Sequence, residues 1–154
     1  MTILGSRTLH WATEADCEAT ARSLASLSAL RDAFVELHGP LGAGKTTFVR
    51  HLLRALGVAG RVKSPTYAVM EPYELPGGMV WHFDFYRFND PQEWEDAGFR
   101  DVFASPGLKL AEWPEKAEGL LPAPDLRVDI EPLEGEARRV TLAAGTPRGL
   151  ELLR

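Results

Sequence analysis

The stretch Gly39-Pro40-Leu41-Gly42-Ala43-Gly44-Lys45-Thr46 decides how this chain is expected to fold. It matches the pattern G-x-x-x-x-G-K-[ST], and the residues on both sides supply the context that this pattern requires. Residues 33–38 are mostly apolar and typical of a strand, whereas 46–56 show helical spacing of apolar residues and end before Gly57. The sequence therefore predicts a strand, a glycine-rich loop and a helix in succession.

Each residue type in this loop has a role in binding phosphate. Glycines allow successive backbone N–H groups to turn toward one anion, and the start of the following helix adds the positive end of its dipole. The Lys45 ammonium can reach β- and γ-phosphate oxygens, the Thr46 hydroxyl is a suitable ligand for Mg²⁺, and Thr47 is placed for the α-phosphate. We therefore expect ATP and Mg²⁺ as cofactors, bound by the motif and Thr47.

Two carboxylates are candidates for the other half of a magnesium site. Asp84 and Glu112 each follow an apolar run, the place at which a strand of such a fold carries a metal-binding acid. An acid there can also mark the exit of a strand to solvent. His82 could lie near the phosphates or serve packing, and Trp113 could stack on the nucleotide or cover the core.

Length and composition favour one compact domain. The chain has 154 residues, a formal net charge of −5 and a single cysteine, Cys17, which excludes an intrachain disulfide. The acidic balance argues against a chain that holds nucleic acid by itself, because phosphate binding requires a basic face. No apolar run approaches the roughly 20 residues that cross a bilayer, and residues 1–10 lack the features of a signal peptide. We expect a soluble, cytoplasmic protein with no membrane contact.

The remaining sequence predicts further helices and strands around the central unit. They are expected as a helix at 13–29, a hairpin within 66–87, a short helix at 91–97, and strands at 108–112, 126–133 and 137–143. Residues 145–154 are expected to form a loosely attached tail. The predicted fold is an α/β, P-loop NTPase-like single domain over 1–154. Its central sheet has a parallel core and antiparallel additions and is flanked by helices.

The phosphate-binding motif leaves several classes of protein open. Guanine specificity is unsupported, because the only asparagine, Asn89, is not part of an N-K-x-D motif. A small-molecule kinase is possible by size, although no arginine-rich lid segment is evident. Scattered arginines such as Arg138 and Arg139 are expected at the surface or in ion pairs, and Arg87 is the best candidate for an arginine that acts on the transition state. A third class is a scaffold in which ATP occupancy alone stabilises a complex.

Four blocks of sequence resemble the TsaE (YjeE) family of small bacterial ATPases. They are LGAGKTT at 41–47, VKSPTY at 62–67, HFDFYR at 82–87 and EWP at 112–114. The resemblance implies an ATPase that is needed to make threonylcarbamoyladenosine next to the tRNA anticodon. It further implies action with a TsaB–TsaD heterodimer, docking mainly on TsaD. Slow ATP turnover would reset that complex, and tRNA would be contacted only through it.

The resemblance also implies roles for individual residues. Thr46 and Glu112 would bind Mg²⁺, and Asp84 would orient or deprotonate the attacking water or assist the metal. Lys45 would act on the β- and γ-phosphates during catalysis, and the Thr66 hydroxyl would sense the γ-phosphate. These five residues form the catalytic and metal-binding set that the resemblance implies.

The position of the base is implied only roughly by the resemblance. The family seats adenine in a region that corresponds here to Thr13, at the start of the first helix, or to Glu115. The apolar residues of 99–103 could close over the nucleotide or face a partner, and the sequence does not choose between these two roles.

Overall fold

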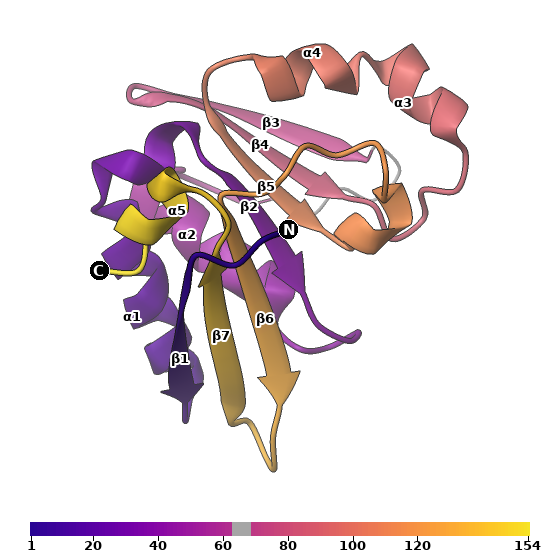
Figure 1. The fold of residues 1–154 in the computed structure, drawn as a ribbon. Coiled ribbons are helices and arrows are strands. Elements are labelled where there is room, and N and C mark those ends of the chain that lie inside the picture. The colour runs from indigo at the N-terminus through magenta and orange to yellow at the C-terminus, as the bar shows by residue number, and fades with distance from the viewer. Residues whose placement is uncertain (63–68) are drawn as a thin grey trace.

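A mixed seven-stranded sheet forms the centre of the molecule (Figure 1). The computed structural model describes residues 1–62 and 69–154. The strands are β1 (Gly5–Trp11), β2 (Phe34–His38), β3 (Met70–Leu75), β4 (Gly78–Asp84), β5 (Leu108–Glu112), β6 (Leu126–Pro132) and β7 (Arg138–Ala144). Their order is β1-β7-β6-β2-β5-β4-β3. The pairs β2–β5, β2–β6 and β4–β5 are parallel and the other three are antiparallel, which confirms the predicted parallel core with antiparallel additions.

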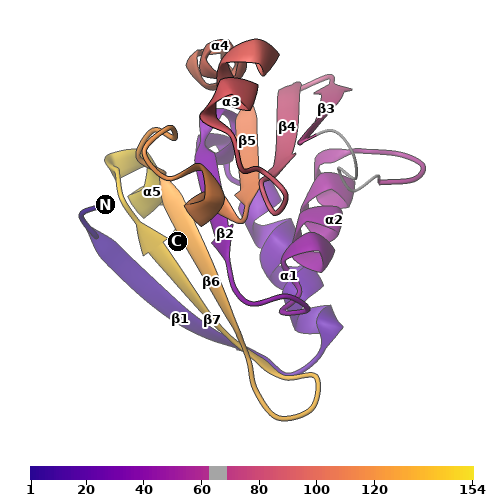
Figure 2. The same ribbon diagram turned by 90° about the vertical axis from the view of Figure 1, so that its right-hand side faces the viewer.

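Helices cover parts of both faces of this sheet. They are α1 (Glu14–Ala25), α2 (Lys45–Leu56), α3 (Pro91–Ala97), α4 (Phe99–Ala104) and α5 (Pro147–Glu151), with 3₁₀ turns η1 (Ser28–Asp32) and η2 (Pro114–Ala117). α1 and α2 pack together on one face, and α3 and α4 lie over the other face near β4 and β5 (Figure 2). Successive strand residues point to opposite faces. Thus β2 contributes Val35 and Leu37 to the core beneath α1 and α2, and Phe34 to the core beneath α3 and α4.

The core beneath α3 and α4, here called the aromatic core, is built largely from rings. Phe83 of β4 stacks on Phe85, with ring centroids 5.5 Å apart, and meets Phe99 of α4 edge to face at 5.2 Å. Trp94 of α3 meets the same Phe99 ring at 5.6 Å. Phe99 is only 5% exposed, so it packs in this core instead of closing over a ligand or facing a partner.

Local sequence signals account for several helix and strand limits. Thr13 precedes α1, and the Asp16 carboxylate accepts the backbone N–H of Ala12 at 2.8 Å and that of Thr13 at 3.3 Å, which confirms the predicted helix start. α3 begins after Asp90, whose side chain caps it. β3 and β4 form the predicted hairpin. The first helix ends at Ala25, earlier than predicted, because the chain there passes into η1.

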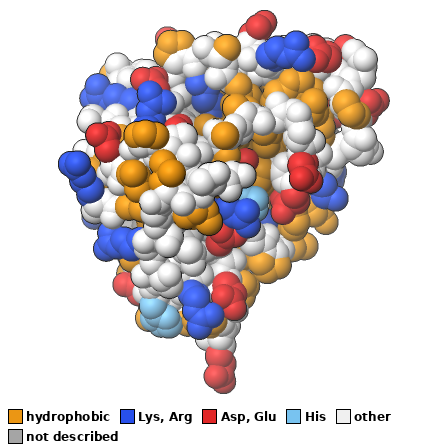
Figure 3. Space-filling model, in the orientation of Figure 1, with side chains coloured by type: hydrophobic (Ala, Val, Ile, Leu, Met, Phe, Trp, Pro, Cys, Tyr) orange, Lys and Arg blue, Asp and Glu red, His pale blue; other side chains and the backbone are white. Residues whose placement is uncertain are grey.

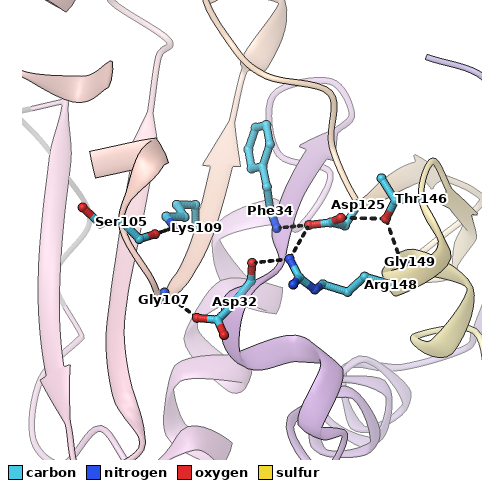
Figure 4. Close-up of polar contacts among 9 residues, drawn as sticks. All are labelled: Asp32, Phe34, Ser105, Gly107, Lys109, Asp125, Thr146, Arg148 and Gly149. Carbon is cyan, nitrogen blue, oxygen red and sulfur yellow. Dashed lines mark hydrogen bonds and ion pairs between the residues drawn. The ribbon is translucent and has the colours of Figure 1, made fainter. Parts of the chain in front are cut away.

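Residues 145–154 are packed against the sheet, so the prediction of a loosely attached tail is wrong. Leu152 is 1% exposed and belongs to the core beneath α1 and α2. The Asp125 carboxylate ties the tail to the sheet (Figure 4), since it accepts the Thr146 hydroxyl at 2.6 Å and the Phe34 N–H at 2.8 Å. These contacts join segments that are distant in sequence, and local composition therefore does not reveal them.

The sequence analysis missed the first strand, β1. It lies at an edge of the sheet, pairs with β7 on one side, and buries only its last residue, Trp11. An edge strand with so little burial does not show the alternation of apolar and polar residues that identifies a strand. The missed strand is relevant to the candidate site, because its last residue, Trp11, lies two residues before Thr13.

Charges of both signs are interspersed on the face of the molecule shown in Figure 3. Two ion pairs lie on β6 and β7: Arg127 is 2.8 Å from Asp129, and Arg139 is 3.0 Å from Glu131. This face therefore lacks the continuous basic patch that a nucleic-acid-binding surface requires. No helix within the described ranges is long and apolar enough to span a membrane.

Candidate functional site

The glycine loop, residues 39–44, joins β2 to α2 at the centre of the sheet. Gly39, Gly42 and Gly44 have φ angles of 152°, 80° and 110°, a region that side chains disfavour. A Cβ atom on Gly39 would also lie 2.6 Å from the carbonyl oxygen of Ile130 on β6. The loop conformation therefore requires glycine at these positions. The loop is followed directly by α2, whose first backbone N–H groups have no hydrogen-bond partner within the helix.

Lys45 is buried in the first turn of α2 and is 5% exposed. Its Nζ atom donates to the carbonyl oxygen of Gly39 and lies 3.5 Å from the centroid of the Trp113 ring. Burial lowers the pKa of Lys45, and nearby carboxylates, Glu112 foremost, act in the opposite direction. The side chain is thus held across the glycine loop, with its amine between the Gly39 carbonyl and the Trp113 ring.

A chain of hydrogen bonds links α2, β5 and β4. The Thr46 hydroxyl donates to Oε1 of Glu112 over 2.8 Å, and His82 Nε2 lies 2.6 Å from Oε2 of the same carboxylate. Glu112 is 2% exposed and His82 is 1% exposed. His82 therefore lies behind Glu112, and of its two predicted roles the structure supports that of a hydrogen-bonded, packed residue.

Asp84 lies beside Glu112 at the end of the sheet. The two residues are partners across the parallel strands β4 and β5, as expected of acids that end neighbouring strands. Burial raises the pKa of Asp84, an effect that the Glu112 charge strengthens and that the hydrogen bond from the Tyr86 N–H, 3.0 Å from Oδ1, partly offsets. The Asp84 carboxylate is therefore easier to protonate than an ordinary aspartate.

A cavity of about 270 Å³ lies over these groups. It is lined by the glycine loop, the start of α2, both acids and two aromatic residues: Leu41, Gly42, Ala43, Gly44, Lys45, Thr46, Thr47, Asp84, Tyr86, Glu112 and Trp113. Gly39 and Pro40 belong to the loop but do not line the cavity. Trp113 has a φ of 55° and packs on the aromatic core, which agrees with its predicted role of covering the core, and it also lines the cavity. Its ring lies 5.0 Å from that of Tyr86.

Thr46 and Glu112 have the chemistry to hold Mg²⁺, because this cation prefers hydroxyl and carboxylate oxygens. Within the described ranges, no group of three or more His, Cys, Asp or Glu residues could hold a metal ion. Mg²⁺ usually takes one or two protein ligands and completes its shell with water and substrate phosphates. One hydroxyl and one carboxylate, hydrogen-bonded over 2.8 Å, therefore fit a cation that arrives with a phosphate ligand.

A second cavity of about 150 Å³ adjoins the first, because both are lined by Ala43, Gly44 and Thr47. Its other lining residues come from β1, α1 and the β6–β7 hairpin: Trp11, Thr13, Glu14, Cys17, Glu136 and Arg138. Thr13 is thus next to the glycine loop, as expected if a base is bound there. Arg138 donates from Nε to the carbonyl oxygen of Ala43 over 2.9 Å. Sequence reasoning missed this support of the loop, because a contact across 95 residues leaves no local signal.

One other predicted site residue, Glu115, is not part of this arrangement. Glu115 is exposed on η2 and lines neither cavity. Its charge nevertheless acts on the site, because it raises the pKa of Lys45. Thr66 lies outside the described residues. The described part of the site therefore consists of the glycine loop, the start of α2, and the ends of β4 and β5.

The sequence matches a family model described as threonylcarbamoyl adenosine biosynthesis protein TsaE over residues 11–140. The chain belongs to the TsaE family. The matched range includes the glycine loop, both acids and every residue that lines the two cavities. The resemblance that the four sequence blocks indicated is thereby confirmed.

Curated relatives in the TsaE family cover most of this chain. A protein of Haemophilus influenzae named tRNA threonylcarbamoyladenosine biosynthesis protein TsaE is 43% identical over 133 residues, which is 86% of this chain and 84% of the relative. A Bacillus subtilis protein of the same name is 36% identical over 108 residues, 70% of this chain and 67% of the relative. The crystal structure of Bacillus subtilis YdiB has the same fold, with a TM-score of 0.81 and 24% identity over 99% of this chain and 95% of that one.

Proposed function

We propose that this chain is a P-loop ATPase that binds Mg²⁺–ATP in the larger cavity and serves the biosynthesis of tRNA threonylcarbamoyladenosine. The observation that carries the proposal is the hydrogen bond of 2.8 Å between Thr46 and Glu112 at a cavity lined by the glycine loop and Lys45. One cavity thus combines a loop suited to phosphate, the Lys45 ammonium, and the Thr46 hydroxyl and Glu112 carboxylate, which are suited to Mg²⁺. Membership of the TsaE family supports the pathway.

The triphosphate would lie along the glycine loop. Lys45 would leave the Gly39 carbonyl and donate to β- and γ-phosphate oxygens, while Thr47 holds the α-phosphate and the first N–H groups of α2 donate to phosphate oxygens. Thr46 and Glu112 would hold Mg²⁺, which neutralises phosphate charge when it is bound. The second cavity, next to Thr13, would accept the base. In this arrangement β5 supplies one metal ligand, Glu112, and α2 supplies the other, Thr46, while the glycine loop and the start of α2 supply the phosphate ligands.

Asp84 would orient the attacking water and accept its proton. It lines the cavity beside Glu112, and burial raises the pKa of its carboxylate, which makes it a better proton acceptor than an ordinary aspartate. A single carboxylate with a raised pKa and no positioned arginine among the residues that line this cavity is consistent with slow turnover by the isolated chain. A partner would then complete the site.

The partner that we propose is a TsaB–TsaD heterodimer, engaged mainly through TsaD, with ATP turnover resetting the complex between cycles. The net charge of −5 and the paired charges over β6 and β7 support a role in which tRNA is held by the partner and not by this chain. This chain would contribute the nucleotide-dependent step.

Reconstitution of tRNA threonylcarbamoylation tests the proposal. TsaB, TsaD, tRNA and the pathway's threonylcarbamoyl donor are combined with ATP, with and without this chain, and modified tRNA is counted per TsaD. We expect repeated turnover only with the chain present, and release of inorganic phosphate alongside it. Equal product with and without the chain would contradict the proposed role.

The same reactions separate the two alternative functions. Labelled γ-phosphate that appears on a small metabolite instead of as inorganic phosphate would indicate a kinase. An Asp84→Asn variant that binds ATP, does not hydrolyse it and still supports full repeated turnover would indicate a scaffold. The proposal expects neither result, because it assigns the γ-phosphate to water and makes hydrolysis necessary for the next cycle.

A further inference from the structure

On the side away from the cavity, the Glu112 carboxylate contacts a buried histidine, His82. His82 Nε2 lies 2.6 Å from Oε2 of Glu112, and Oε1 of the same carboxylate accepts the Thr46 hydroxyl at 2.8 Å. His82 lies on β4, two residues before Asp84, and does not line the cavity. The two oxygens of Glu112 are therefore used differently: one faces the Thr46 hydroxyl and the other faces the imidazole.

His82 makes no second side-chain hydrogen bond in the described part of the chain. Its other ring nitrogen, Nδ1, is buried and has no hydrogen-bond partner there. A carboxylate oxygen accepts hydrogen bonds, so Nε2 of His82 is the donor in this contact. The ring thus donates from Nε2 to Glu112, while Nδ1 stays buried without a partner in the described part of the chain, which costs free energy.

A buried glutamate needs such a restraint to bind metal well. Its side chain has three rotatable bonds and is only 3% exposed, so water is not available to hold the oxygen that faces away from the cavity. Partners behind a metal ligand orient it, and their removal typically lowers metal affinity by about 10–100-fold. A histidine that donates one hydrogen bond from beneath Glu112 has the geometry of such a partner.

We propose that His82 is a positioning residue that holds Oε2 of Glu112, so that Oε1 is presented with the Thr46 hydroxyl to a divalent cation. This inference rests on the proposed function, because it needs a cation at Thr46 and Glu112. His82 itself touches neither nucleotide nor cation. Its effect is on the affinity for the metal and not on the affinity for the metal-free nucleotide.

Two amide variants of His82 test the proposal, because they differ in where they place a donor. The side-chain N–H₂ of Gln lies one bond farther from the backbone than that of Asn, so His82→Gln can reproduce the Nε2 donor and His82→Asn places its amide near the Nδ1 position. The readouts are Mn²⁺ affinity at saturating ADP, ADP affinity in EDTA, and the melting temperature. His51→Asn is the matched control, since His51 also lies near carboxylates, 3.4 Å from Glu14, but lines neither cavity.

We expect His82→Asn to weaken Mn²⁺ binding by about tenfold or more while His82→Gln and His51→Asn stay within about threefold of wild type. ADP affinity in EDTA should be the same in all four proteins. Wild-type Mn²⁺ affinity in both His82 variants would overturn the inference. So would an equal loss in both variants, or a loss of metal-free ADP affinity in parallel with a lower melting temperature, since each indicates packing alone.

Failure of the inference and failure of the proposed function give different results. If the wild-type chain binds no Mn²⁺ in the presence of ADP, the proposed function is contradicted, and the inference with it. If the wild-type chain binds Mn²⁺ with ADP and His82→Asn binds it equally well, only the role of His82 is contradicted. The wild-type titration therefore comes first.

Discussion

Replacing Glu112 by alanine should destabilise the ligand-free protein by about 2–4 kcal/mol. The carboxylate is 2% exposed and forms two hydrogen bonds, to Thr46 at 2.8 Å and to His82 at 2.6 Å. Thr46 faces the cavity, so water can replace its lost partner at little cost. The His82 donor is 1% exposed and would stay unpaired, which costs about 1–3 kcal/mol, and the lost side-chain packing adds about 1 kcal/mol.

Replacing Glu112 by glutamine should preserve stability to within about 1 kcal/mol. The amide can accept one hydrogen bond and donate the other, because the Thr46 hydroxyl rotates and the His82 ring has a second tautomer. Removal of the buried charge also offsets part of any strain. The glutamine variant should nevertheless bind Mn²⁺ in the presence of ADP at least about tenfold more weakly, because an amide is a poorer ligand than a carboxylate.

Denaturant unfolding of the three proteins without ligand measures these stabilities, and thermal melts should follow at about 2–4 °C per kcal/mol. Two results would refute the reasoning. If Glu112→Gln loses as much stability as Glu112→Ala, the charge and not the pair of hydrogen bonds stabilises this part of the fold. If Glu112→Ala is as stable as wild type, the buried contacts to Thr46 and His82 do not hold in solution.

Three further predictions concern single residues. Burial raises the pKa of Asp84, so its protonated form stabilises the fold at low pH, and this contribution is lost as the pH rises through the raised pKa. Asp84→Asn should therefore melt at a higher temperature than wild type near pH 7, and the difference in melting temperature should shrink toward the ordinary aspartate pKa of 3.8. An equal difference at both pH values would contradict this. Gly149→Ala should lower the free energy of unfolding by about 1–3 kcal/mol, because its Cβ would lie 1.8 Å from the carbonyl oxygen of Asp125. The control Gly77→Ala should change this free energy little, because its Cβ would have no atom within 4 Å. Equal stability of the two variants in denaturant unfolding would show that α5 is not fixed against the sheet. Burial raises the pKa of Cys17 to about 12, so a thiol reagent near pH 8 should modify the folded protein roughly a thousandfold more slowly than free cysteine, and fast labelling would argue against a buried thiol.

Sequence reasoning succeeded where the structure is decided by neighbouring residues. The strand, glycine loop and helix around 39–44 follow one another directly, and glycines at positive φ fix the turn. The hairpin of β3 and β4 and the short helix α3 also carry local turn and cap signals. The two acids could be brought together from sequence because both end apolar strands, and parallel neighbours place their ends at one edge.

Contacts between segments that are distant in sequence could not be predicted from local sequence patterns. β1 is an edge strand with one buried residue, so its pattern carries no periodicity. The docking of α5 depends on Asp125, and the support of the glycine loop depends on Arg138, which is 95 residues away from Ala43 in sequence. The hydrogen bond from His82 to Glu112 likewise needs the register of β4 and β5. In each case the partner is chosen by topology and not by local composition.

Calorimetric titration of ATP with Mg²⁺ into the wild-type chain and into Lys45→Ala tests the central claim most directly. Lys45 is the buried cation next to the glycine loop, and its loss removes charge-assisted hydrogen bonds to two phosphates, which corresponds to a loss of about 100-fold or more in affinity. Lys116→Ala, an exposed lysine on η2 outside the cavity, serves as the control and should bind like wild type. We predict one ATP site in wild type and Lys116→Ala, and none measurable in Lys45→Ala. Equal affinity in all three proteins would contradict the assignment of the glycine loop as the ATP site.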